Sequence, residues 1–281
     1  MGLRNPLYLD AETLASLAEY YEVGVDRMRE VVETQRRTRS GGGKFGLGMA
    51  EAEGALGRDV ETQLSYSIEP SQKAVVSKTI DGLLQTPGAL VPFDDAHARQ
   101  VDDVMELSGD LVMTPTSLAG KMLYLFREYL GQESTDMNAL MQGRPLSQEE
   151  VLPLIQRAYF NGALPPIPLL MELRSPQFPV RAFVSLAHSG FVDSAVASHI
   201  KGEHRVLGQV AYLVAGGDEG YLSTEKWLLH GWDYMVRRVL MASLDKTVSD
   251  MIDRLGITLE AQDVQEYITG PAIVLNAVAV Y

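Results

Sequence analysis

The N-terminal part of the chain alternates short apolar stretches with helical patterns. Residues 7–9 are apolar, Asp10 follows them, and apolar residues then recur at spacings of three and four from residue 14 to residue 21. This order predicts a short strand and then a helix that Asp10 caps, because a side-chain oxygen at that position satisfies free backbone N–H groups. A second helix is predicted to be capped by Ser71 and to end at the turn residues 86–88. Its expected apolar face contains Val76, Ile80, Leu83 and Leu84.

Between these two helices the pattern changes twice. Residues 33–39 are strongly polar and run into the glycines of residues 41–43, which predicts an exposed arm or linker. Apolar residues then alternate with small or polar ones, first from Phe45 and again over residues 60–68. A period of two is typical of half-buried strands, so we expect a glycine-rich hairpin over residues 41–68.

The rest of the chain mixes predicted strands and helices. Strands are predicted over residues 104–113, 182–187, 205–214 and 272–281, and helices over residues 116–130, 224–255 and 259–268. The proline-rich residues 164–168 and 175–179 must be extended, and we interpret them as a connector between two halves. The final segment is almost wholly apolar, which predicts a central, buried strand.

These elements predict an α+β fold of mixed strands and helices in two packed halves. The chain has 281 residues, of which 46% are hydrophobic and 22% charged, so it fits one large domain or two closely packed ones. We place an N-terminal α+β half with the glycine-rich hairpin at residues 1–145. A C-terminal α+β half, ending in the buried strand, is expected at residues 146–281.

Charge and cysteine content exclude several classes of function. The 24 Lys and Arg residues against 37 Asp and Glu residues give a net charge of −13, which argues against a dedicated nucleic-acid-binding protein. The absence of cysteine rules out disulfides, thiolate metal sites and cysteine nucleophiles. Asp10 and Glu12 interrupt any N-terminal secretion signal, and the sequence has no apolar run of the length that a membrane span needs. We therefore expect a cytoplasmic protein.

The motifs with chemical potential do not assemble into a catalytic pattern. Gly41, Gly43 and Gly46 match a dinucleotide-loop spacing, but an arginine-rich segment precedes them and a strand pattern follows, whereas such a loop joins a strand to a helix. No histidines have the spacing of a metal pair. We predict no catalytic residue, no cofactor and no metal ligand. The densest acidic stretch, which could hold a divalent cation, contains Asp94, Asp95, Asp102, Asp103, Glu106 and Asp110.

One cluster opposes the overall charge and is the candidate interaction site. Four basic residues lie just before the predicted hairpin, where they could contact an acidic partner, and two apolar residues open the hairpin. The candidate interaction residues are Arg36, Arg37, Arg39, Lys44, Phe45 and Leu47.

Several short motifs along the chain carry a family resemblance. They are Leu7-Tyr8-Leu9-Asp10, the glycine-rich residues 41–48, Val206-Leu207-Gly208-Gln209-Val210, and the closing residues 270–281. Together they resemble a widespread bacterial family labelled as a domain of unknown function, which includes the DolA subunit of the two-gene Dodola anti-phage system. The chain departs from the family in lacking a basic residue after Tyr281, and residues 165–179 match no known pattern. The resemblance implies a bacterial cytoplasmic protein that works with a ClpB-like AAA+ ATPase, and it carries over no catalytic residue.

We therefore expect a non-enzymatic sensor, adaptor or effector subunit of anti-phage defence that acts by binding another protein. A first alternative is a membrane-active effector that exposes the hairpin of residues 45–68. A second alternative is a metal-dependent hydrolase or nuclease that uses the carboxylates between Asp94 and Asp110. A homo-oligomer is left open as a further form of partnership.

Overall fold

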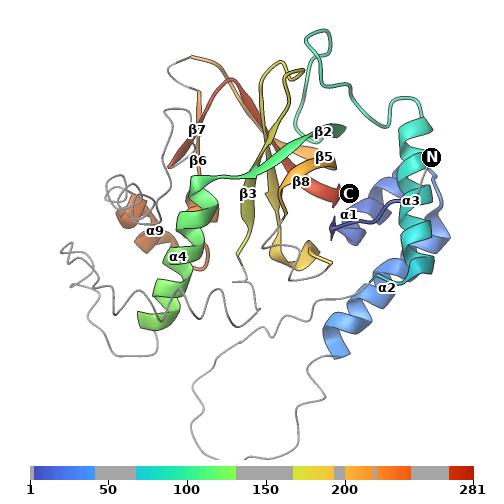
Figure 1. The fold of residues 1–281 in the computed structure, drawn as a ribbon, viewed down its shortest axis with the longest axis horizontal. Helices are drawn as coiled ribbons and strands as arrows, with labels where there is room; N and C mark the ends of the chain where they lie inside the picture. Colours follow the sequence, from blue (N-terminus) through green and yellow to red (C-terminus); the bar gives the residue numbers. More distant parts are fainter. Residues whose placement is uncertain (1–2, 42–67, 131–166, 193–199, 218–219, 242–265) are drawn as a thin grey trace, which may run out of the picture.

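The structure is a computed structural model that describes residues 3–41, 68–130, 167–192, 200–217, 220–241 and 266–281. It is an α+β fold in which helices surround a barrel of strands (Figure 1), which confirms the expected class. No helix among these residues has the length and apolar character that crossing a bilayer requires.

Five strands close into a barrel. They are β2 (Val104–Met113), β3 (Leu169–Arg174), β4 (Arg181–Leu186), β5 (Gly202–Val214) and β8 (Ala272–Val280). Their order is β8-β4-β3-β2-β5, and β5 pairs again with β8. The β4–β8 pair is parallel and the other neighbours are antiparallel. The short strand β1 (Tyr8–Leu9) pairs with the end of β8, where Tyr8 lies opposite Val280.

Alternation along the strands fills the barrel and leaves a second apolar face outside it. In β3, Leu169, Met171 and Leu173 belong to the central cluster of buried residues, whereas Leu170 packs outward against Trp227. Strand β8 is buried on both faces along nearly its whole length, as its apolar sequence predicts. The C-terminal strand is therefore the centre of the fold.

Three helices cover one side of the barrel (Figure 1): α1 (Ala11–Tyr20), α2 (Val25–Gly41) and α3 (Pro70–Gln85). Leu14, Met28 and Ile80 from these helices share one apolar cluster with Leu207 of β5 and Val278 of β8. The predicted cap of α1 is confirmed, because Asp10 Oδ1 accepts a hydrogen bond of 3.1 Å from the Thr13 N–H. The cap of α3 is Glu69 rather than Ser71, and the helix ends before Thr86 as the turn residues indicate.

A second group of elements covers the opposite side (Figure 1). They are α4 (Pro115–Leu130), β6 (Tyr221–Ser223), α8 (Glu225–Leu228), α9 (Tyr234–Met241) and β7 (Tyr267–Thr269). The 3₁₀ turn η1 (His188–Gly190) lies beside β1, where Gly190 packs against the ring of Tyr8. Trp227 of α8 is almost fully buried and its indole N–H donates to Ser185 Oγ at 3.1 Å, so this layer is tied to β4.

The predicted polar arm at residues 33–39 is wrong, because these residues form the second half of α2. Among the α2 side chains that the structure describes, Met28 and Val31 are the buried hydrophobic ones, while Arg29 and Arg36 form exposed ion pairs with α1. A helix that buries a narrow stripe has a mostly polar sequence, and residues 33–39 therefore have the composition of a linker.

The prediction of a proline-rich connector is also wrong in part. Strand β3 lies between the two proline clusters and forms a wall of the barrel. Near the C-terminus, Tyr267 and Ile268 belong to β7 and not to a helix. The helical stretch predicted from residue 224 is interrupted at Gly231, which has a positive φ of 78°. The predicted hairpin of residues 45–68 lies outside the described residues except for Ile68.

Candidate functional site

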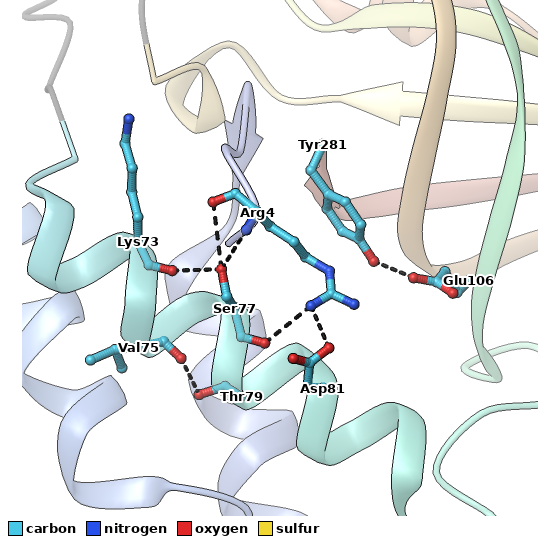
Figure 2. A network of polar contacts seen from close by, with 8 residues as sticks. All are labelled: Arg4, Lys73, Val75, Ser77, Thr79, Asp81, Glu106 and Tyr281. Carbon is cyan, nitrogen blue, oxygen red and sulfur yellow. Dashed lines mark hydrogen bonds and ion pairs between the residues drawn. The ribbon is translucent and has the colours of Figure 1, made fainter. Parts of the chain in front are cut away.

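A hollow of about 900 Å³ lies between α3, the N-terminal segment and the outer face of the barrel. We call it the Arg4 hollow. Its lining includes Leu3, Arg4, Asp81, Leu84, Arg205 and Tyr281. Figure 2 shows the polar contacts that hold Arg4 and Tyr281 in place beside it.

Arg4 attaches the N-terminal segment to α3 (Figure 2). Its backbone N–H donates to Ser77 Oγ at 2.8 Å, and its Nη1 donates to the Ser77 carbonyl at 3.3 Å and to Asp81 Oδ1 at 2.5 Å. The side chains of Arg4 and Asp81 are only 13% and 20% exposed, so this ion pair is partly shielded from water. Lys73 adds a second tie, because its Nζ donates to Asn5 Oδ1 at 2.6 Å.

Tyr281 connects the same arginine to the barrel (Figure 2). The Arg4 guanidinium carbon lies 5.0 Å from the centroid of the Tyr281 ring, within range of a cation–π interaction. The Tyr281 hydroxyl donates a hydrogen bond to Glu106 Oε1 of β2. Arg4 and Tyr281 therefore join α3, the end of β8 and β2 into one network.

The electrostatics of the network keep both groups protonated at neutral pH. Burial raises the pKa of the Tyr281 hydroxyl, and the hydrogen bond to Glu106 raises it further. Burial alone would lower the pKa of Arg4, but the hydrogen bond to Asp81 and the proximity of Tyr281 give a net rise. A general base must be deprotonated near the working pH to accept a proton, so neither of these two groups suits that role at neutral pH.

Two apolar side chains are exposed beside this polar network. Leu3 is 67% exposed and Leu84, on α3, is 37% exposed. The sequence placed Leu84 on the buried face of its helix together with Val76, Ile80 and Leu83, but only those three are buried. Arginine and tyrosine are enriched at protein interfaces, and the two leucines beside them add exposed apolar area.

The six residues predicted as an interaction site are not brought to this hollow in the part of the chain that can be described. Arg36 lies on the exposed face of α2, where its Nε donates to Glu12 Oε1 at 2.9 Å. Arg37 and Arg39 belong to α2, but their side chains are outside the description, and Lys44, Phe45 and Leu47 lie outside the described residues.

The acidic stretch is spread over separate places. Asp94 accepts hydrogen bonds within its own loop, from the Ala96 N–H at 2.9 Å and from His97 Nδ1 at 2.7 Å, and the contact with His97 lowers the pKa of this exposed carboxyl. Asp103 accepts from the Gln100 N–H at 2.7 Å, and Glu106 accepts from Tyr281. Within the described ranges no three His, Cys, Asp or Glu side chains are arranged to hold a metal ion.

A second groove, of about 560 Å³, lies at residues 172–181 and 269–271. Glu172 is 9% exposed and accepts hydrogen bonds from Arg174 Nε at 2.8 Å and from Arg181 Nε at 3.0 Å. These contacts fasten β3 to β4 on the outside of the barrel, so we assign them a structural role.

The sequence analysis missed Arg4, Asp81 and Tyr281. Arg4 and Asp81 are 77 positions apart, and no spacing rule connects them. The signals that were present are indirect: the closing strand was predicted to be central, and the strand of residues 7–9 was predicted to precede α1. If the two strands had been paired, Arg4 and Tyr281 would have been placed close together.

Comparison with known proteins gives one significant match. A family described as a domain of unknown function (DUF6414) matches residues 3–281, which is nearly the whole chain. No curated protein and no solved structure matches significantly.

Proposed function

The chain belongs to the family of the domain of unknown function DUF6414. We propose that it is a non-enzymatic, protein-binding subunit of bacterial anti-phage defence. In this role it acts as a sensor, adaptor or effector. Its working partner is a ClpB-like AAA+ ATPase, and it acts in the cytoplasm.

The observation that carries this proposal is the fixed pair of Arg4 and Tyr281 beside exposed leucines. Arginine and tyrosine are enriched among the residues that dominate binding energy at interfaces. Here the Arg4 side chain is already held by Asp81, and Tyr281 by Glu106, so little side-chain entropy remains to be lost when a partner binds. The neighbouring Leu3 and Leu84 provide apolar area that is exposed in the free protein.

The defence role is supported by the motif resemblance and by where three of its motifs lie. Residues 7–10, 206–210 and 270–281 are far apart in sequence, yet β1 and β5 both pair with β8. Tyr8 and Val206 both lie opposite Val280. The motifs that resemble the family with the DolA subunit thus meet in the core of the fold, and Tyr281 is the motif residue that lines the Arg4 hollow.

The test is an affinity pull-down of the full chain from its native host, with and without phage challenge, followed by mass spectrometry. We expect an AAA+ ATPase or another stoichiometric protein with the wild type and about tenfold less of it with Leu84→Ser. Leu213→Ser is the matched control, because Leu213 is 43% exposed but lies near the other end of β5. Elution of the protein alone would contradict the proposal.

If the protein elutes alone, two further experiments test the alternatives. The membrane-active reading predicts liposome leakage that is lost in a Phe45→Ser, Leu47→Ser variant. The metal-dependent reading predicts a thermal midpoint that rises with added divalent cation, since a ligand that binds only the folded state stabilises it.

A further inference from the structure

The strand wall of the Arg4 hollow carries two opposite charges that are not paired with each other. Glu203 and Arg205 are exposed, line the hollow and lie two positions apart on β5, so their side chains leave the same face of the strand. Among the described residues, no ion pair or side-chain hydrogen bond joins either of them to another group.

The spacing of these two charges is set by the barrel. Arg205 exchanges two backbone hydrogen bonds with Tyr281, of 2.8 and 3.0 Å, which hold this part of β5 in a fixed position. Alternate residues of a strand are about 6.6 Å apart, at about 3.3 Å per residue. The backbone positions from which a negative and a positive side chain project into the hollow are therefore fixed relative to each other.

The residues opposite Glu203 and Arg205 on β2 increase the difference in charge between the two ends of this strand wall. Glu203 lies directly opposite Asp110 on β2, so two carboxylates face each other, whereas Arg205 lies opposite the neutral Ser108. Arg174 lies opposite Asp110 on its other side, on β3, but its guanidinium is paired with Glu172. Like charges directly opposite each other destabilise a sheet, and a cation bound between them relieves that repulsion. One end of the strand wall is thus negative and the other positive, while Leu84 on α3 gives the hollow an apolar wall.

We propose that the Arg4 hollow binds an extended segment of a partner protein with the pattern basic–apolar–acidic. Such a segment projects its first and third side chains toward β5, about 6.6 Å apart, where they meet Glu203 and Arg205. Its middle side chain projects the opposite way, toward Leu84. This inference rests on the proposed protein-binding function and names the chemistry of the partner.

A free amino acid cannot pair with both charges of the strand wall at once. Its ammonium and carboxylate groups are attached to one carbon, so they are too close together to face both Glu203 and Arg205. The hollow of about 900 Å³ is also larger than such a molecule requires.

The test compares the wild type with a charge swap, Glu203→Arg with Arg205→Glu, which keeps composition and net charge. Each full-length protein is incubated with native-host lysate, treated with a zero-length carbodiimide cross-linker and analysed by mass spectrometry. The matched control exchanges the exposed ion pair on the helical side, Glu19→Arg with Arg29→Glu. Because all four positions are exposed, we expect both variants to fold, and circular dichroism checks this.

For the wild type and the control, we expect a cross-link from Glu203 to a partner lysine that lies two residues from an acidic residue. The swap turns two attractions into two repulsions, so capture of that partner falls about tenfold or more. A synthetic peptide of the cross-linked segment should bind the wild type, and it should bind the milder variant Glu203→Gln up to about fivefold less tightly, because one exposed charge pair is lost.

The outcomes separate the two claims. If all proteins capture the same partner equally, or if the cross-link lies elsewhere, the basic–apolar–acidic inference is overturned while the protein-binding function stands. If none of them captures a partner, the protein-binding function fails, and this inference fails with it.

Discussion

The guanidinium of Arg4 stacks on the ring of Tyr281, so the N-terminal segment and the end of the central strand β8 are in direct contact. Asp81 on α3 holds the arginine, and Glu106 on β2 accepts from the tyrosine hydroxyl. One pair of side chains therefore links the helical layer to the barrel. Changes at either residue should affect both folding and the shape of the hollow.

Replacing Arg4 tests the contribution of its ion pair. Arg4→Met keeps the apolar stem but leaves the Asp81 carboxylate partly buried without its cation, which we expect to cost about 1–3 kcal/mol of unfolding free energy. Arg29→Met removes a pair whose side chains are both 61% exposed, and it should change stability by less than about 0.5 kcal/mol. Urea denaturation measures both values. Equal losses would show that Arg4 is no more important than a surface residue.

Removing the Tyr281 hydroxyl should have an effect that depends on pH. The pKa of Tyr281 is raised above its usual value of 10.0, so the folded protein keeps this proton when the unfolded chain has lost it. The resulting stabilisation is complete below pH 10 and is lost as the pH rises further. Between pH 9 and pH 11 we expect the wild type to lose about 1 kcal/mol more stability than Tyr281→Phe. Denaturation curves at the two pH values give these losses. If the wild type and Tyr281→Phe lose the same unfolding free energy between pH 9 and pH 11, the prediction is wrong.

The sequence predicted the elements that bury a regular face. Strands β2, β4, β5 and β8 and helices α1, α3 and α4 were found because their apolar residues recur at a strand or helix period. Strand β3 was missed because Leu170, on its outer face, is buried beneath Trp227, so the six-residue strand shows no polar alternation and stands between prolines. Helix α2 was missed for the opposite reason, since it buries too few residues.

The candidate site could not be predicted from the sequence. Arg4 and Asp81 are 77 positions apart, and Glu106 and Tyr281 are 175 apart. Glu106 and Tyr281 meet because β5 pairs with both β2 and β8 and closes the barrel, and local spacing carries no information about that closure. Leu84 is an error of the opposite kind. Helical periodicity predicts it in the core, whereas the structure exposes it.

The cap of α1 offers a test of local structure in the helical layer. Asp10 accepts from the Thr13 N–H and, through Oδ2, from Thr13 Oγ1 at 2.8 Å. Asp10→Ala should cost about 1 kcal/mol, because the first turn of the helix loses a partner for its free N–H groups. Ser16→Ala, which removes an exposed hydroxyl within the same helix, should stay within about 0.5 kcal/mol. Thermal denaturation compares the two, and a larger loss for Ser16→Ala would contradict the role of the cap.

A substitution at Gly120 tests how closely α4 and α8 pack, on the side of the barrel opposite α1, α2 and α3. Alanine in place of glycine within a helix normally adds up to about 1 kcal/mol of stability. At Gly120 of α4, however, an added Cβ would lie 2.4 Å from the Trp227 carbonyl oxygen and 3.3 Å from the Leu228 Cα. Backbone atoms of α8 cannot turn aside as a flexible side chain does, so α4 and α8 must separate. We therefore expect Gly120→Ala to destabilise the protein by about 1–3 kcal/mol, measured by urea denaturation. A gain in stability would mean that α4 and α8 are not in this close contact in solution.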